Sequence, residues 1–156
     1  MTMMKPLALG LATAALVAGA AIAESHAETP PAVGARKAQM QLYAFNLGTL
    51  GAMVQGNMDY DADAATAAAG NIVKLSTLAA GPMWAPGTGA DAVEASRALP
   101  AIWENMDDVI SKAMALNEAA MAMETAAAEG LEPLQAAMKD LGAACGACHK
   151  EYREPE

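Results

Sequence analysis

The chain has 156 residues, and 9 Lys and Arg against 18 Asp and Glu give a formal net charge of −9. This length suits one domain. The acidic balance argues against a nucleic-acid partner, because phosphate contacts require basic clusters, and favours a protein partner with a basic patch. Ala and Met are abundant while Phe occurs once, a composition that favours helices over strands.

The first 23 residues have the layout of a secretory signal peptide. A short start with Lys5 precedes an uncharged run of small and apolar residues, 7–23, which Glu24 ends. Small residues permit cleavage after Ala23 or Ala27; an uncleaved membrane anchor is the alternative, although the run is near the lower limit of roughly 20 residues for a span. We expect cleavage, export to the periplasm and a mature domain over residues 28–156 that is not embedded in a membrane. Loss of Lys5 leaves 8 positive against 18 negative residues, a charge of −10.

Apolar spacing predicts two helices in the first half of this domain. The first covers residues 33–55 and is followed by Gly56. The second covers residues 61–80, opens with acidic residues that suit the helix dipole, and ends at Gly81-Pro82. Their predicted inner faces carry Met40, Leu47, Leu50 and Val54 in the first helix, and Ile72, Leu75, Leu78 and Ala79 in the second.

Residues 81–98 contain two Pro and three Gly, so we expect a loop with one short helical turn near residues 90–96. A third helix is predicted from Pro100 to Ala128, and Gly130 ends it. The fourth covers residues 132–153, and Pro155 follows it. The inner face of the third consists of Ile102, Trp103, Met106, Ile110, Ala113, Ala120 and Met123; that of the fourth consists of Leu134, Ala137, Met138, Leu141, Cys145 and Cys148. Four amphipathic helices predict an all-α, antiparallel four-helix bundle.

The motif that carries chemistry is Cys145-Gly146-Ala147-Cys148-His149. Residues at i, i+3 and i+4 lie on one face of a helix. Two thiols at this spacing can add to the two neighbouring vinyl groups of haem as thioethers, and the following histidine can bind the iron. The spacing is the attachment signature of c-type haem.

Three other interpretations of the motif remain open at this point. A thioredoxin-like redox pair uses Cys-x-x-Cys, but near the start of a helix in a βαβ unit. A zinc site needs about four ligands, whereas the mature chain offers at most His26 besides this cluster. A disulfide at such close helical spacing would be strained.

A Cys-x-x-Cys-His motif at the end of a four-helix chain resembles the class II c-type cytochromes, which comprise cytochrome c prime and its low-spin relatives. The likeness covers residues 33–153. Four stretches carry it: residues 36–40 (RKAQM), 57–62 (NMDYDA), 99–104 (LPAIWE) and 141–153 (LGAACGACHKEYR).

The resemblance implies one covalently attached haem c near the C-terminal end of the fourth helix. Cys145 and Cys148 would form its thioethers, and His149 would be the proximal iron ligand. It also implies that Arg153 lies on the proximal side, where the alternative is a cation favoured by the helix end. Cationic side chains expected near the haem propionates are Arg36, Lys37 and, less directly, Arg97; the alternative for them is a surface position.

The resemblance places Met40 on the open side of the iron. If its thioether binds, the haem is six-coordinate and low-spin, which suits one-electron transfer. If Met40 only blocks that side, the haem is five-coordinate and binds NO or CO. The residue type does not decide, because the chain contains 12 methionines and a methionine on a helical stripe is often core filler.

We therefore expect a periplasmic monohaem electron carrier with a redox protein partner, and a gas-binding haem protein as the alternative. Neither is an enzyme; a weak peroxidase would need a distal acid or base, and none is evident. The resemblance also allows a homodimer through the first two helices. Trp84 and Trp103 are expected to pack in the bundle, and Tyr43, Tyr60 and Tyr152 have no evident catalytic geometry.

Overall fold

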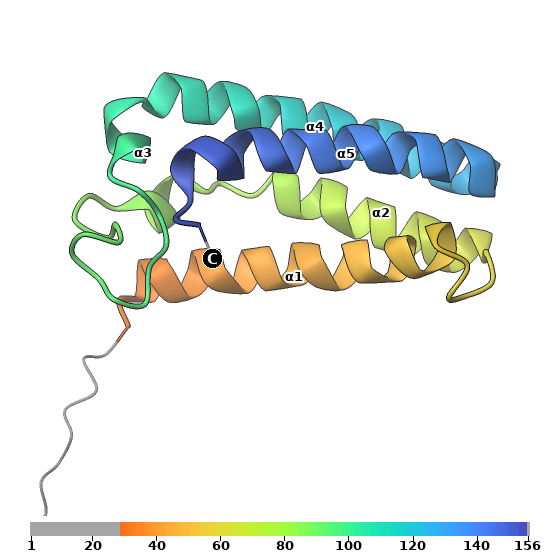
Figure 1. Ribbon diagram of the computed structural model, residues 1–156, viewed down its shortest axis with the longest axis horizontal. Helices are drawn as coiled ribbons and strands as arrows, with labels where there is room; N and C mark the ends of the chain where they lie inside the picture. Colours follow the sequence, from red (N-terminus) through yellow and green to blue (C-terminus); the bar gives the residue numbers. More distant parts are fainter. Residues whose placement is uncertain (1–28, 156) are drawn as a thin grey trace, which may run out of the picture.

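The computed structural model describes residues 29–155 and shows four long helices in a bundle (Figure 1). The long helices are α1 (Pro31–Val54), α2 (Ala62–Ser76), α4 (Met106–Glu129) and α5 (Leu131–Tyr152). Two short ones lie between α2 and α4: the 3₁₀ helix η1 (Gly81–Trp84) and α3 (Ala101–Glu104). The predicted four-helix bundle is confirmed. The predicted signal peptide and both cleavage points lie outside the described residues.

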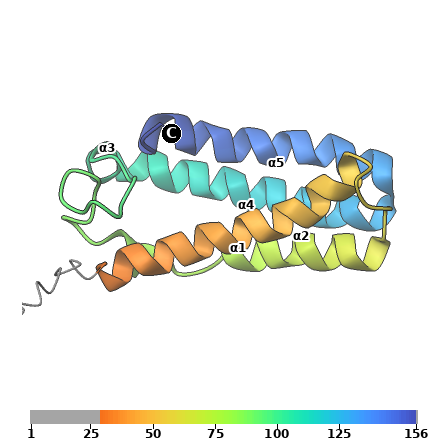
Figure 2. The same ribbon diagram turned by 60° about the horizontal axis from the view of Figure 1, so that its bottom comes forward.

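Neighbouring long helices run antiparallel, so the start of α1 and the end of α5 lie at the same end of the bundle (Figures 1 and 2). The segment with η1 and α3 lies at this end too. Contacts are extensive between α2 and α4 and between α4 and α5, and sparser between α1 and α5. No helix in residues 29–155 has the length and hydropathy of a membrane span.

The core consists of side chains from all four long helices. Small residues on α2 let α4 approach closely: Ala65 and Ala69 are fully buried, and a Cβ added to Gly70 would meet Glu124 Oε1 at 2.7 Å. The side chain of Asp61 caps α2 by accepting a 2.9 Å hydrogen bond from the Ala64 amide, as expected for an N-terminal carboxylate. The largest fully buried side chains are Leu50, Met53, Ile72, Met123, Leu134, Leu141 and Val33.

The predicted third helix is wrong in one respect, because the chain leaves helical geometry at Asn105 (φ −129°, ψ 43°). The Asn105 side chain donates to the carbonyl oxygen of Ala101 at 3.0 Å. The backbone amide of Asn105 donates to the same carbonyl at 3.1 Å, so two bonds close the last turn of α3. The break separates α3 from α4, and the face of α4 that packs on the core contains Val109 rather than the predicted Ile110, which is exposed.

The predicted second helix ends early, at Ser76 instead of residue 80. Ser76 Oγ donates to the Val73 carbonyl at 2.7 Å and Thr77 Oγ1 to the Lys74 carbonyl at 3.0 Å. Leu78 consequently lies outside the helix and is exposed, contrary to its predicted inner position. Ala79 and Ala113 are exposed as well.

Candidate functional site

The last two turns of α5 carry the Cys-x-x-Cys-His motif. Cys145, Cys148 and His149 are each half-buried, and both cysteines are free thiols. Cys148 packs against the small cluster of Ala98, Ile102 and Tyr152. The helix begins at Leu131 after Gly130, whose φ of 135° favours glycine.

The side of α5 that faces α1 is identified by Gln135, whose Nε2 donates to the Val54 carbonyl of α1 at 3.2 Å. Steps of three and four residues from Gln135 lead along the same side to Cys145 and His149. On α1, Gln39 Nε2 donates to the Leu75 carbonyl of α2 at 2.8 Å, so Gln39 lies on the side of α1 that faces α2. Met40 is the next residue, and the helical turn rotates its side chain away from α2. The two candidate iron ligands, His149 and Met40, thus lie on the sides of α5 and α1 that face each other.

Met40 is 39% exposed although it lies at this junction. α1 and α5 are the pair of adjacent long helices with the sparsest contacts. The loose packing leaves Met40 accessible on the side from which the resemblance expects it to face the iron. Met40 was predicted on the inner face of the first helix, but its side chain is not packed in the core.

The electrostatic surroundings favour neutral forms of all three motif side chains. Burial, followed by the positive charges of Arg153 and Arg97, lowers the pKa of His149. A neutral imidazole is the form that binds haem iron. Burial is also the main cause that raises the pKa of Cys145 and of Cys148. A reactive redox pair needs a lowered thiol pKa, so this site does not resemble the thioredoxin type.

The donor set fits haem better than a bare metal ion. Within residues 29–155, no group of three or more His, Cys, Asp and Glu side chains could hold a metal, which speaks against the zinc interpretation. Haem brings four nitrogen donors of its own, so one imidazole beside two thiols at helical i, i+3 spacing is sufficient. The residues present fit a covalently attached haem.

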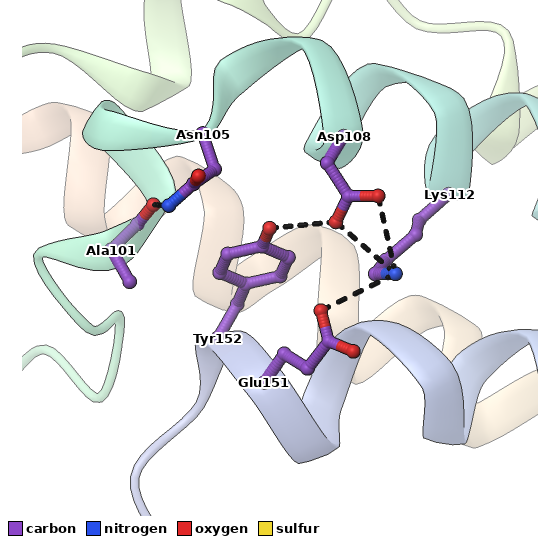
Figure 3. Close-up of polar contacts among 6 residues, drawn as sticks. All are labelled: Ala101, Asn105, Asp108, Lys112, Glu151 and Tyr152. Carbon is purple, nitrogen blue, oxygen red and sulfur yellow. Dashed lines mark hydrogen bonds and ion pairs between the residues drawn. The ribbon is translucent and has the colours of Figure 1, made fainter.

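The turn that follows His149 is held by contacts with α4 and with the segment before α3. The Tyr152 hydroxyl donates to Asp108 Oδ2 at 2.6 Å, and Lys112 lies between Asp108 Oδ2 at 3.1 Å and Glu151 Oε2 at 3.4 Å (Figure 3). The Leu99 amide donates to the Tyr152 carbonyl at 3.0 Å. These contacts hold the end of α5 in place on two sides.

Arg36 occupies a buried position that the sequence analysis did not foresee. Its guanidinium donates to the Met83 carbonyl at 3.1 Å, to Thr88 Oγ1 at 2.8 Å, to Ser96 Oγ at 2.7 Å and to the Thr88 carbonyl. It also lies 5.1 Å from the ring centroid of Trp84. Four of its five N–H donors therefore hold the 81–98 loop against α1. The expected propionate contact stays a prediction.

The other predicted cations fall into two groups. Arg97 and Arg153 both lie close enough to His149 to lower its pKa, and Ala98 and Arg153 form an isolated antiparallel bridge. Arg97 Nη2 also donates to the Glu154 carbonyl. Lys37 is exposed on α1. The structure thus brings Arg97 and Arg153 to the motif and leaves Lys37 at the surface.

Tyr43 is a buried polar residue whose position the sequence did not indicate. This side chain is 8% exposed and lies in the main core with Leu141. Burial raises the pKa of Tyr43 to about 12, with Cys145 as the second cause. The spacing of Tyr43 from Arg36 and Met40 on α1 was the available signal.

Comparisons with known proteins indicate the family of this chain. The protein-family model described as Cytochrome C′ matches residues 31–153 of this chain. Cytochrome c-554 of Cereibacter sphaeroides is 39% identical over 153 residues, which cover 98% of this chain and 100% of that protein.

Solved structures are similar to this chain in fold as well as in sequence, as two examples show. Cytochrome c′ from Rhodobacter spheroides has a TM-score of 0.78 and 41% identity over 80% of this chain and 96% of its own. A ferrous variant of cytochrome c prime from Alcaligenes xylosoxidans with bound NO has a TM-score of 0.70 and 31% identity over 80% and 94% of the two chains.

Proposed function

The chain belongs to the cytochrome c′ family, and we propose that Cys145, Cys148 and His149 hold its haem. Members of this family carry covalently bound haem c and act as electron carriers or gas-binding proteins, not as enzymes. When bound, haem supplies a one-electron Fe(III)/Fe(II) couple and an iron site that can take a further ligand. The observation that supports the assignment is the half-buried motif on the side of α5 that faces α1.

On the proximal side, this chain's residues hold His149 in place and neutral. Burial and the two nearby arginines keep the imidazole unprotonated, so its ring nitrogen is free to bind iron. The contacts of Tyr152 with Asp108 and Leu99 fix the turn that follows. A fixed helix end orients the ligand, which is how surrounding contacts tune a metal site.

On the distal side, we propose that Met40 serves as the sixth ligand and that the protein transfers single electrons in the periplasm. Three features support ligation: the position of Met40 on the side of α1 facing α5, its exposure, and the soft, flexible thioether. Nothing in the arrangement requires a substrate to be turned over. The net charge of −9 favours a redox partner with a basic patch.

The second candidate is gas binding at an open distal face. It is supported by the Alcaligenes xylosoxidans structure with bound NO and by the accessible position of Met40, which need not reach the iron. In that case Met40 would limit access rather than bind. Assembly as a homodimer is a further prediction of the family resemblance.

One optical experiment separates the two functions. If Met40 binds, the ferric holoprotein shows the methionine-to-iron charge-transfer band and the ferrous protein resists CO. Met40→Ala then abolishes the band and admits CO. A high-spin ferric spectrum with ready CO binding in the unmodified protein would contradict electron transfer through a Met40-ligated haem and support the gas-binding function.

A further inference from the structure

The side chain of Ser96 joins two parts of the chain that are distant in the sequence. Ser96 is 4% exposed, and its Oγ accepts a 2.7 Å hydrogen bond from Arg36 Nη2 of α1. The same oxygen accepts a 3.2 Å hydrogen bond from the backbone amide of Ala98. A hydroxyl oxygen has two lone pairs that accept. Ser96 therefore uses one of them to hold α1 and the other to hold the segment that leads to α3.

That segment, residues 97–99, pairs with the chain at the end of α5. The Leu99 amide donates to the Tyr152 carbonyl at 3.0 Å, and the Glu154 amide donates to the Arg97 carbonyl at 2.9 Å. The pairing lies at the end of the bundle where α1 begins and α5 ends (Figure 1). A continuous set of hydrogen bonds thus leads from α1 through the serine to the end of α5.

This pairing also places two cations next to the proposed proximal ligand. The amide of Arg153 donates to the His149 carbonyl at 3.1 Å, and Arg153 bridges to Ala98, the neighbour of Arg97. Burial, followed by the charges of Arg153 and Arg97, lowers the pKa of His149. A nearby positive charge favours ferrous over ferric haem, because oxidation adds one positive charge to the iron. The midpoint potential of a haem bound at His149 therefore depends on where these arginines lie.

We propose that Ser96 is a positioning residue for the proximal side of the haem: it holds residues 97–99 against the end of α5 and so keeps the two arginines close to His149. The proposal rests on the haem site proposed above. Arg36 anchors this arrangement on α1, the helix of the proposed distal ligand. One buried hydroxyl thus connects the distal helix with the charges on the proximal side.

The alternative is that Ser96 only helps to bury Arg36, and Thr88 supplies the matched control. Thr88 is also buried, at 8% exposure, and its Oγ1 accepts a 2.8 Å hydrogen bond from Arg36 Nη1. Its own proton goes to the Ala85 carbonyl of the same loop at 2.7 Å. Ser96→Ala and Thr88→Val each remove a hydroxyl that bonds to Arg36, but only the first removes the link to Ala98. Both should lower the melting temperature by similar amounts.

The first measurement is a redox titration of the holoprotein, followed by its optical spectrum. We expect Ser96→Ala to lower the midpoint potential, so that the ratio of reduced to oxidised protein at a fixed potential falls about threefold, as for charges that withdraw by a few ångströms. Thr88→Val should leave the ratio unchanged. In an Arg97→Gln background, Ser96→Ala should have a smaller effect, because one of the charges that it positions is absent.

The second measurement, hydrogen exchange followed by mass spectrometry, tests the link in the holoprotein without use of the potential. The amides of Ala98 and Glu154 should be similarly protected in the unmodified protein, because both bonds open when residues 97–99 leave the end of α5. Ser96→Ala should speed exchange at Glu154, and Thr88→Val should not. The comparison within the unmodified protein decides even if Ser96→Ala does not fold.

An unchanged potential in Ser96→Ala would overturn the proposal, as would an equal shift in Thr88→Val or a full shift in the Arg97→Gln background. A freely exchanging Glu154 amide beside a protected Ala98 amide would overturn it too. Haem attachment is measured by mass in the same samples. With haem attached, any of these results refutes the role of Ser96 alone. Absence of attached haem in the unmodified protein refutes the proposed site itself, and the proposal with it.

Discussion

The hydroxyl of Tyr152 donates a 2.6 Å hydrogen bond to Asp108 Oδ2 and so joins the last turn of α5 to the first turn of α4 (Figure 3). The ring of Tyr152 packs against Ala98 and Ile102, while Asp108 is exposed and also pairs with Lys112. The contact fixes the helix end immediately after His149.

Tyr152→Phe should lower the melting temperature at neutral pH and have less effect in acid. The hydrogen bond from Tyr152 is the first cause that lowers the pKa of Asp108, and Lys112 is the second. A lowered carboxyl pKa stabilises the fold above the pKa of the unfolded chain, and this contribution is lost as pH falls through the folded pKa. Thermal unfolding followed by circular dichroism between pH 7 and pH 2 measures the difference between the two proteins.

The control for this prediction is Tyr60→Phe, because the acceptor of Tyr60 is a backbone carbonyl that does not titrate. Its destabilisation should change little over the same range. A Tyr152→Phe difference that stays constant down to pH 2 would show that the charge of Asp108 does not contribute.

Arg36→Lys should destabilise the protein by about 3 kcal/mol, because a lysine cannot reproduce the four hydrogen bonds of the guanidinium to the 81–98 loop. Urea unfolding measures the free energy, and limited proteolysis should cut the loop faster. The neighbouring exposed residue supplies the control: Lys37→Ala should change the free energy of unfolding and the rate of loop cleavage only a little. Equal effects of the two substitutions would contradict the anchoring role of Arg36.

Leu141→Ala should destabilise the fold by about 2–5 kcal/mol, the usual range for a fully buried leucine. Leu141 lies one turn before Cys145, so the variant also tests whether the core supports the motif. Leu42→Ala removes a leucine that is 51% exposed and should cost far less. Urea unfolding measures the free energy of unfolding of both variants. Similar losses of stability in the two would mean that Leu141 is not packed as described.

The parts of this molecule that follow from short-range pattern could be predicted. Covalent haem attachment depends on residues within about one helical turn. It can therefore be predicted from the spacing of Cys145, Cys148 and His149 without knowledge of the fold. The four long helices followed from apolar spacing in the same way. The break at Asn105 did not, because apolar spacing continues through it and the bonds of Asn105 to Ala101 that end α3 are visible only in the structure.

The contacts of polar residues inside the bundle could not be predicted. Apolar spacing cannot show that Thr88 and Ser96, more than 50 residues away in the chain, supply buried acceptors for the guanidinium of Arg36. The same applies to Tyr43, whose relation to Cys145 arises from the packing of α1 near α5. Contacts between distant segments require the three-dimensional structure.

His149→Ala should leave haem attached through the cysteines but remove the proximal ligand. We expect a changed Soret band and a large shift in midpoint potential, because the axial ligand sets the potential of haem. Lys150→Ala alters the exposed neighbour and should leave both unchanged. An unaltered spectrum in His149→Ala would mean that another residue binds the iron.

The central claim is that Cys145 and Cys148 hold haem covalently. The most direct measurement is the mass of the denatured protein, produced with the machinery for c-type haem attachment, before and after Cys145→Ser and Cys148→Ser are introduced together. We predict that the unmodified protein carries the added mass of one haem and that the double variant carries none. A double variant that still holds haem through denaturation, or an unmodified protein that loses it, would contradict the account.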